Sequence, residues 1–182
     1  MRLLLTVVLA VSSVPAFAQA KVERPPHPVA TPVPAAKAED VKSIDGIIAA
    51  LYDVISGPPG QARDWNRMRS LFIPGGRMMA VGGKTRDVVG IRLLTVNDYV
   101  ASSGPILLEK GFHERELKRT VEQFGDIAHV WSTYEGVTEK DKHRMRGINT
   151  LQLMFDGQRW WIVSLMWEAE GEGVALPAKY LP

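Results

Sequence analysis

Apolar and polar positions alternate most clearly near the C-terminus, in two runs that flank Asp156-Gly157. Both residues of this pair tolerate a positive φ, so the segment 146–168 is predicted to form a β-hairpin. In the first arm Asn149, Leu151 and Leu153 fall on one face. The second arm is apolar on both faces. Strict alternation places Trp160, Ile162, Ser164 and Met166 on one face, and Trp161, Val163, Leu165 and Trp167 on the other. Both faces of this strand therefore need cover.

Two more strands are predicted immediately before the hairpin, over 111–124 and 126–135, with Gly125-Asp126 as the turn between them. The second strand alternates cleanly. One face carries Ala128, Val130, Ser132 and Tyr134, and the other carries His129, Trp131, Thr133 and Glu135. A one-residue error in register would exchange these two faces.

The first half of the sequence has the spacing of amphipathic helices. Ser43 is a candidate N-cap, and apolar residues from Ile44 to Ile55 follow at intervals of three and four. The Gly-Pro-Pro-Gly segment at 57–60 ends that helix. The remaining predicted elements are a helix at about 62–72, strands at 77–81 and 89–94, and a helix from Thr95 or Asn97 to about 103–105.

The predicted order is helix, helix, strand, strand, helix and then four antiparallel strands. This order indicates an α+β fold in which a cone-like, curved, mixed or antiparallel sheet wraps over about three helices from the N-terminal half. The other face of the sheet remains available for pairing with a partner.

The two ends of the chain are predicted to lie outside this domain. Residues 1–20 have the three parts of a signal peptide, with cleavage after Ala18 or Ala20. Export to the periplasm or the medium is therefore expected, with no membrane span in the mature protein. A Pro-rich segment, 21–40, is predicted to be a disordered linker, 41–171 the folded domain and 172–182 a loose tail onto which Tyr180 and Leu181 could dock.

Composition narrows the possible partners. The chain has no cysteine, so no disulfide stabilises it, and its formal net charge at pH 7 is only +2. The basic residues between Lys140 and Arg146 are interleaved with acidic ones, which is typical of a solvated loop. Nucleic acid is therefore not an expected partner.

The motifs in this order resemble those of the nuclear transport factor 2-like superfamily, which is also described as SnoaL-like or ketosteroid-isomerase-like. They are RSLFIPGG at 69–76, FGDIAHVWSTYEG at 124–136 and RGINTLQLMFDGQRWWIVS at 146–164. The resemblance is greatest to exported bacterial members without an assigned activity. It implies a cone-shaped sheet around an apolar pocket and homodimers formed through the outer face of the sheet.

The resemblance does not supply an active site. The ketosteroid isomerase pattern requires a carboxylate base on the first strand, where this chain has Ala80. It requires an acid on the fifth strand, where Asn149 can donate a hydrogen bond but cannot act as an acid. Tyr52 lies about two residues away from the tyrosine position of the first helix. Isomerase chemistry by that mechanism is therefore not expected.

Several residues could line a ligand pocket. If the faces are assigned correctly, the candidate ligand-binding residues are Ser132, Tyr134, Asn149, Leu151, Trp160, Ile162 and Ser164. A few polar groups among apolar ones is the composition of a small-molecule site. The alternative is hydrogen bonding within a core, because buried hydroxyls and amides need partners in any case.

His129 and Tyr134 are the candidate groups for proton transfer. A role for His129 requires its imidazole to point into the pocket, whereas an imidazole in the outer face would eliminate it. Neighbouring residues on a strand face opposite ways, so His113, Glu114 and Glu116 are not expected to bind a metal, and no cofactor motif is present.

Three functions are consistent with these features. The first is an exported, homodimeric protein that binds a small apolar or amphipathic molecule without covalent chemistry. The second is a lyase, hydratase or isomerase that uses His129 or Tyr134. The third is a structural module for protein interaction, held near a partner by the linker.

Overall fold

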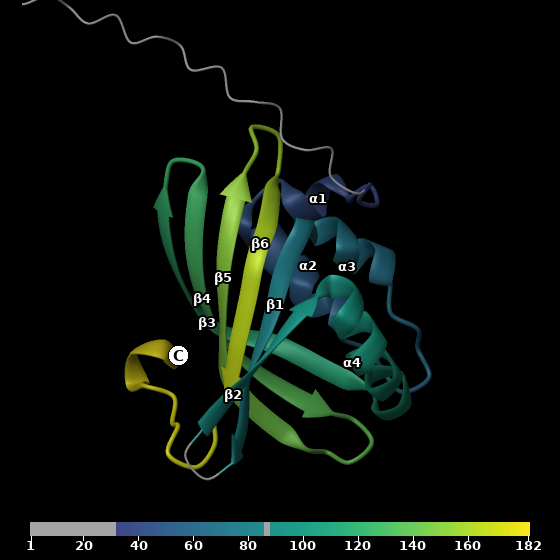
Figure 1. The fold of residues 1–182 in the computed structure, drawn as a ribbon, viewed down its shortest axis with the longest axis vertical. Helices are drawn as coiled ribbons and strands as arrows, with labels where there is room; N and C mark the ends of the chain where they lie inside the picture. Colours follow the sequence, from purple (N-terminus) through teal and green to yellow (C-terminus); the bar gives the residue numbers. More distant parts are fainter. Residues whose placement is uncertain (1–31, 86–87) are drawn as a thin grey trace, which may run out of the picture.

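The computed structural model describes residues 32–85 and 88–182 (Figure 1). The predicted signal peptide and the first part of the predicted linker lie outside these residues. The helices are α1 (Ala38–Val41), α2 (Ile44–Ile55), α3 (Trp65–Leu71) and α4 (Val96–Lys110), with a 3-10 helix η1 (Ala178–Tyr180). The strands are β1 (Phe72–Thr85), β2 (Val88–Thr95), β3 (Phe112–Phe124), β4 (Ile127–Thr138), β5 (Arg144–Phe155) and β6 (Trp160–Ala169).

The strands form one sheet in the order β2-β1-β6-β5-β4-β3. Strands β1 and β6 run parallel, and every other neighbouring pair is antiparallel. The sheet curves around helices α2, α3 and α4, which lie on its concave side (Figure 1). The predicted α+β class, with a curved mixed sheet over a few helices, is confirmed.

The helices begin where the predicted caps lie. Ser43 Oγ accepts a hydrogen bond of 3.0 Å from the backbone N–H of Gly46 and so starts α2. Thr95 and Asp98 form a capping box at the start of α4. The inner faces of the helices and the concave face of the sheet form one apolar core around Ile47, Ile48 and Met68, which are fully buried.

Helix α4 is longer than the sequence predicts. The expected end was near 103–105, but the helix continues through Pro105 to Lys110. Leu107 is buried beyond the proline, and its contacts with the core offset the hydrogen bond that the proline removes. The helix ends at Gly111, whose φ is +65° and whose position leaves a Cβ no room, 2.5 Å from Pro59 Cδ.

The packed structure also begins earlier than the predicted start of the domain. Helix α1 lies partly within the range predicted as linker, and Asp40 is 4% exposed. Its carboxylate accepts hydrogen bonds of 2.7 and 2.9 Å from the Arg67 guanidinium, which also reaches Asp53. Arg67 therefore ties α1 to α2 and α3. No helix in the described ranges is long and apolar enough to cross a membrane.

The C-terminal segment packs against the convex face of the sheet, away from the helices (Figure 1). The ring of Tyr180 stacks on Trp131 with centroids 5.2 Å apart and planes nearly parallel. Thr133 Oγ1 donates to the carbonyl of Tyr180 (2.8 Å), and Lys118 Nζ donates to the carbonyl of Leu181 (2.6 Å). The tail predicted to be loose is thus held at the two residues expected to dock.

Candidate functional site

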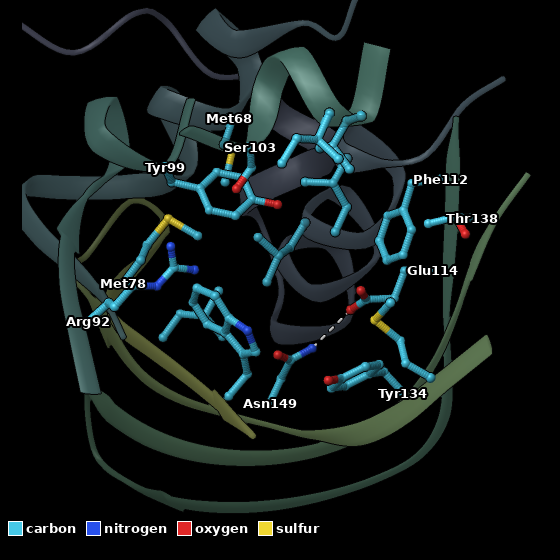
Figure 2. Close-up of a pocket in the computed structure, with 17 residues that line it drawn as sticks. Met68, Met78, Arg92, Tyr99, Ser103, Phe112, Glu114, Tyr134, Thr138 and Asn149 are labelled. Atoms are coloured by element: carbon cyan, nitrogen blue, oxygen red, sulfur yellow. Dashed lines mark hydrogen bonds between the residues drawn. The ribbon is translucent and has the colours of Figure 1, made fainter. Parts of the chain in front are cut away.

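A cavity of about 270 Å³ lies between the concave face of the sheet and helices α2, α3 and α4 (Figure 2). Most of its wall is apolar and includes Leu51, Ile55, Met68, Met78, Leu165 and Trp167. Polar groups interrupt this wall at Arg92, Tyr99, Ser103, Glu114, Tyr134 and Asn149. A mostly apolar wall with a few polar groups is the composition of a small-molecule site.

The register of the sheet explains which side chains reach the cavity. Residues directly opposite one another in neighbouring strands share a face. One such row crosses five strands and consists of Ser132, Asn149, Trp167, Ala80 and Arg92. Asn149, Trp167 and Arg92 line the cavity, whereas Ala80 lies opposite Arg92 in the row without lining it. The row therefore passes from an amide in the interior to a guanidinium at the edge of the sheet.

A directed series of hydrogen bonds begins beside the cavity at Asn149. Its Nδ2 donates to Glu114 Oε1 at 3.1 Å (Figure 2). The same Nδ2 donates to the Tyr52 hydroxyl, also at 3.1 Å. The Tyr52 hydroxyl lies 2.6 Å from Ser132 Oγ, which donates to Glu116. Because Ser132 gives its proton to Glu116, the Tyr52 hydroxyl donates to Ser132.

The two carboxyl groups of β3 that take part in this series, Glu114 and Glu116, lie in different environments. Glu116 accepts hydrogen bonds of 2.9 and 2.6 Å from Arg119, which also pairs with Asp45. Glu114 has the Asn149 amide as its side-chain partner. Burial raises the pKa of Glu114 to about 7, and the hydrogen bond from Asn149 opposes this rise only in part. Glu114 can therefore gain or lose a proton near neutral pH, as a general acid or base must.

The tyrosines around the cavity remain neutral hydrogen-bonding groups. Burial raises the pKa of Tyr52, Tyr99 and Tyr134 well above the usual range, and nearby Glu114 adds to the effect. Tyr99 lies edge-on between Trp65 and Trp167, with ring centroids 6.5 and 6.2 Å apart. Its ring is thereby fixed by aromatic contacts on two sides.

Six of the seven predicted pocket residues lie on the concave face, and they divide into three groups. Tyr134 and Asn149 line the cavity. Ser132 is buried on the same face but bonds to Tyr52 and Glu116. The third group lies in the apolar core on the concave face without lining the cavity, and consists of Leu151, Trp160 and Ile162. Whether Tyr134 and Asn149 bind a ligand stays a prediction.

Ser164 lies on the other face of the sheet, contrary to the predicted alternation. Leu153 is opposite Ile162, but Gln152 is opposite Ser164, so Val163 is an extra residue in β6. This β-bulge reverses the alternation beyond it. Leu165 and Trp167 consequently face the cavity, and Ser164 faces away from it.

His129 also lies away from the cavity. On β4, Ala128 and Val130 are buried in the concave core, so His129 between them points to the convex face. Its ring lies 5.9 Å from that of Trp131. The version of the catalytic hypothesis that uses His129 in the pocket is therefore wrong, because an imidazole on the convex face cannot reach a bound molecule there.

Sequence reasoning missed Glu114 as a candidate for proton transfer. A signal was present, because Phe112, Glu114 and Glu116 alternate along one strand and the apolar first member indicates an inward face. In the sequence, Tyr52 lies near the tyrosine position of the ketosteroid isomerase pattern but out of register with it. In the structure its hydroxyl contacts Asn149, so the two positions that the resemblance singled out do lie together.

No protein-family model and no curated protein match the chain. Among solved structures, it is similar to a protein of unknown function with a cystatin-like fold from Nostoc punctiforme, at 12% identity and a TM-score of 0.52, over 70% of this chain and 88% of that one. It is also similar to a protein provisionally assigned as a scytalone dehydratase from Novosphingobium aromaticivorans, at 9% identity and a TM-score of 0.52, over 71% and 83%.

An NTF-2 like protein of unknown function from Silicibacter pomeroyi aligns at 16% identity and a lower TM-score of 0.48, over 71% of this chain and 94% of that one. The two structures with a TM-score of 0.52 show that this chain shares their fold, which is the curved sheet over a few helices that the sequence motifs implied. At these identities the likeness extends to the fold alone, because this fold hosts unrelated activities. The exported branch of the superfamily stays a prediction.

Within residues 32–85 and 88–182, no three His, Cys, Asp or Glu side chains gather in a way that could hold a metal ion.

Proposed function

We propose that this protein binds a small, largely apolar molecule that carries a polar group, in the cavity on the concave side of the sheet. The observation that carries this proposal is a cavity of about 270 Å³ with a mostly apolar wall and a few converging polar side chains. A cavity of about 150 Å³ already holds benzene, so this one has room for a molecule of about two fused rings.

The inner end of the cavity supports recognition of a hydrogen-bonding group. Glu114, Asn149 and Tyr134 all reach this end (Figure 2). Asn149 is fixed by its bonds to Glu114 and Tyr52, so its orientation is set before a ligand arrives. Protonated Glu114 and neutral Tyr134 can each donate to a carbonyl or hydroxyl oxygen of the ligand. This preorganisation lowers the entropy that binding costs.

Native mass spectrometry of the mature protein, taken directly from the compartment to which the cell delivers it, tests the proposal. We expect a bound mass near one molecule per chain that denaturation releases. In the S103W variant a large ring enters the cavity from α4, and the bound mass should disappear. The adjacent S102W variant places the same ring on the exposed side of the helix and should retain it. An empty wild type, or a ligand that S103W retains, would overturn the proposal.

A second candidate is catalysis of proton transfer, as in a lyase, hydratase or isomerase, with Glu114 in place of His129. It is favoured by the position of Glu114 in the cavity wall and by its pKa of about 7. Tyr134 would polarise the reacting oxygen.

Incubating the identified ligand with the protein in deuterium oxide tests this candidate. We expect the wild type to exchange a carbon-bound hydrogen of the ligand and the E114Q variant not to. The E109Q variant changes an exposed glutamate on α4 and should exchange like the wild type. Absence of exchange in the wild type would leave binding as the function.

A further inference from the structure

Arg92 occupies an unusual position for a surface arginine. It lies on the edge strand β2 opposite Ala80 and is exposed to solvent. Leu94, two residues along, packs against the core, which places Arg92 on the concave side as well. Ile91 and Leu93 point to the convex face and are 53% and 67% exposed. Among the residues that the structure describes, the one cation in the cavity wall therefore lies at the rim of the cavity.

The guanidinium of Arg92 has no bond to another side chain or to a carbonyl in the part of the chain that the structure describes. Every other arginine whose side chain is described there has a partner in a carboxylate, an amide or a backbone carbonyl. An arginine held by the fold is thus the rule in this protein, and Arg92 departs from it at the cavity. Its donors are free to bind a molecule that enters.

The cavity has opposite chemistry at its two ends. Figure 2 shows Arg92 and Glu114 on opposite sides of it, with the ring of Tyr99 between them along the helix side. Between Asn149 and Arg92, the row of the sheet presents the indole of Trp167, and the apolar side chains of Met78 and Leu165 also line the wall. The middle of the cavity is therefore apolar, one end is cationic, and the other carries a carboxyl group hydrogen-bonded to Asn149.

We propose that the ligand is an amphipathic acid whose single carboxylate binds the Arg92 guanidinium at the rim, while its apolar body fills the cavity and its far end meets Glu114 and Asn149. This inference rests on the proposed function, because it names the class of molecule for the same site. A guanidinium matches a carboxylate through two parallel hydrogen bonds. A dianion such as a phosphate is disfavoured, since Arg92 is the only cation among the described residues of the wall and Glu114 repels further negative charge.

Matched probes separate the charge of the ligand from its shape. We would use 2-naphthylacetate against 2-naphthylacetamide, and octanoate against octanamide, because each amide keeps the size of the acid and removes its charge. Binding is followed by calorimetry and by the fluorescence of the tryptophans, one of which lines the cavity. We expect at least one acid to bind about tenfold more tightly than its amide, which is the range for charge-assisted hydrogen bonds at a partly solvated site.

Substitution of Arg92 assigns that preference to one side chain. The R92Q variant should bind acid and amide equally, R92K should retain part of the preference, and R144Q, which removes an exposed arginine from β5, should behave like the wild type. Equal binding of acid and amide to the wild type, or a preference that survives in R92Q, would overturn the proposal. Binding of none of the probes would also overturn it, whereas a bound mass that S103W removes would still support the proposed function.

Discussion

The two faces of the sheet use their polar side chains in different ways. On the concave face, Ser132 and Asn149 bond to other side chains, and the series from Glu114 to Glu116 links three strands to α2. On the convex face, Thr133 and Lys118 bond instead to backbone carbonyls of the C-terminal segment. The hydrogen bonds on the concave face fix the orientation of side chains around the cavity, whereas those on the convex face attach the C-terminal segment to the sheet. Substitutions on the concave face should therefore cost more stability.

The β-bulge at Val163 decides which residues of β6 belong to each face. Deleting Val163 should move Leu165 and Trp167 to the convex face, and we expect a loss of more than about 4 kcal/mol in the free energy of unfolding, or no folded protein. Urea denaturation followed by tryptophan fluorescence measures this loss. The V163A control keeps the number of residues and removes a side chain that is 38% exposed, so it should cost less than about 1 kcal/mol. A deletion variant as stable as V163A would contradict the role given to the bulge.

The adjacent residues Asn149 and Thr150 compare the two faces at one point of β5. The N149L variant leaves Glu114 and the Tyr52 hydroxyl without their amide donor, and we expect a loss of about 2–3 kcal/mol at pH 8. The T150V variant changes a half-buried hydroxyl on the convex face and should cost less than about 0.5 kcal/mol. Urea denaturation of both variants checks the difference. Equal losses would mean that the side-chain network contributes nothing beyond ordinary packing.

Glu114, on the concave face, makes the stability of the folded protein depend on pH. Its pKa is about 7 in the folded protein and near 4.5 when unperturbed, so between these values the folded state binds more protons than the unfolded state. The free energy of unfolding should therefore fall as the pH rises from about 4.5 to 7 and change little from this group outside that range.

The E114Q variant cannot lose a proton there, so it should gain about 1–3 kcal/mol relative to the wild type when both are moved from pH 5 to pH 8. Urea denaturation at the two pH values measures the change. The E109Q variant on the exposed side of α4 provides the control and should follow the wild type. A wild type whose pH dependence equals that of E114Q would mean that Glu114 titrates near its ordinary pKa.

Alternation along the strands predicted most of the face assignments. The inward positions of Ser132 and Tyr134 followed from the strict polar and apolar alternation of β4. The same rule failed in β6, because Trp160 to Trp167 is apolar at almost every position and a bulge leaves no signature in such a run. Only the partner strand, through the offset between Gln152 and Leu153, reveals it.

The candidate site depended on contacts between elements that are distant in the sequence. Tyr52 and Asn149 are 97 residues apart, and the spacing within either element does not predict that they touch. The raised pKa of Glu114 likewise results from its burial, which is a property of the assembled cavity. The sequence therefore predicted the fold and two wall residues of the cavity, but not its titratable group.

The convex face provides the smallest expected effect. Replacing Tyr180 with alanine removes its stacking on Trp131 and should cost about 1 kcal/mol or less, because the ring is only half-buried. Hydrogen exchange should become faster in residues 176–182 and stay unchanged in β5 around Asn149. The F124A control removes an aromatic ring that is 85% exposed and should change neither region.

If Y180A also increases the fraction of dimer in light scattering, the tail competes with a second copy for the convex face, where Ile91 and Leu93 are exposed. If exchange rises around Asn149 as well, the two faces are coupled, and the separation between a face that shapes the cavity and a face that holds the tail is wrong.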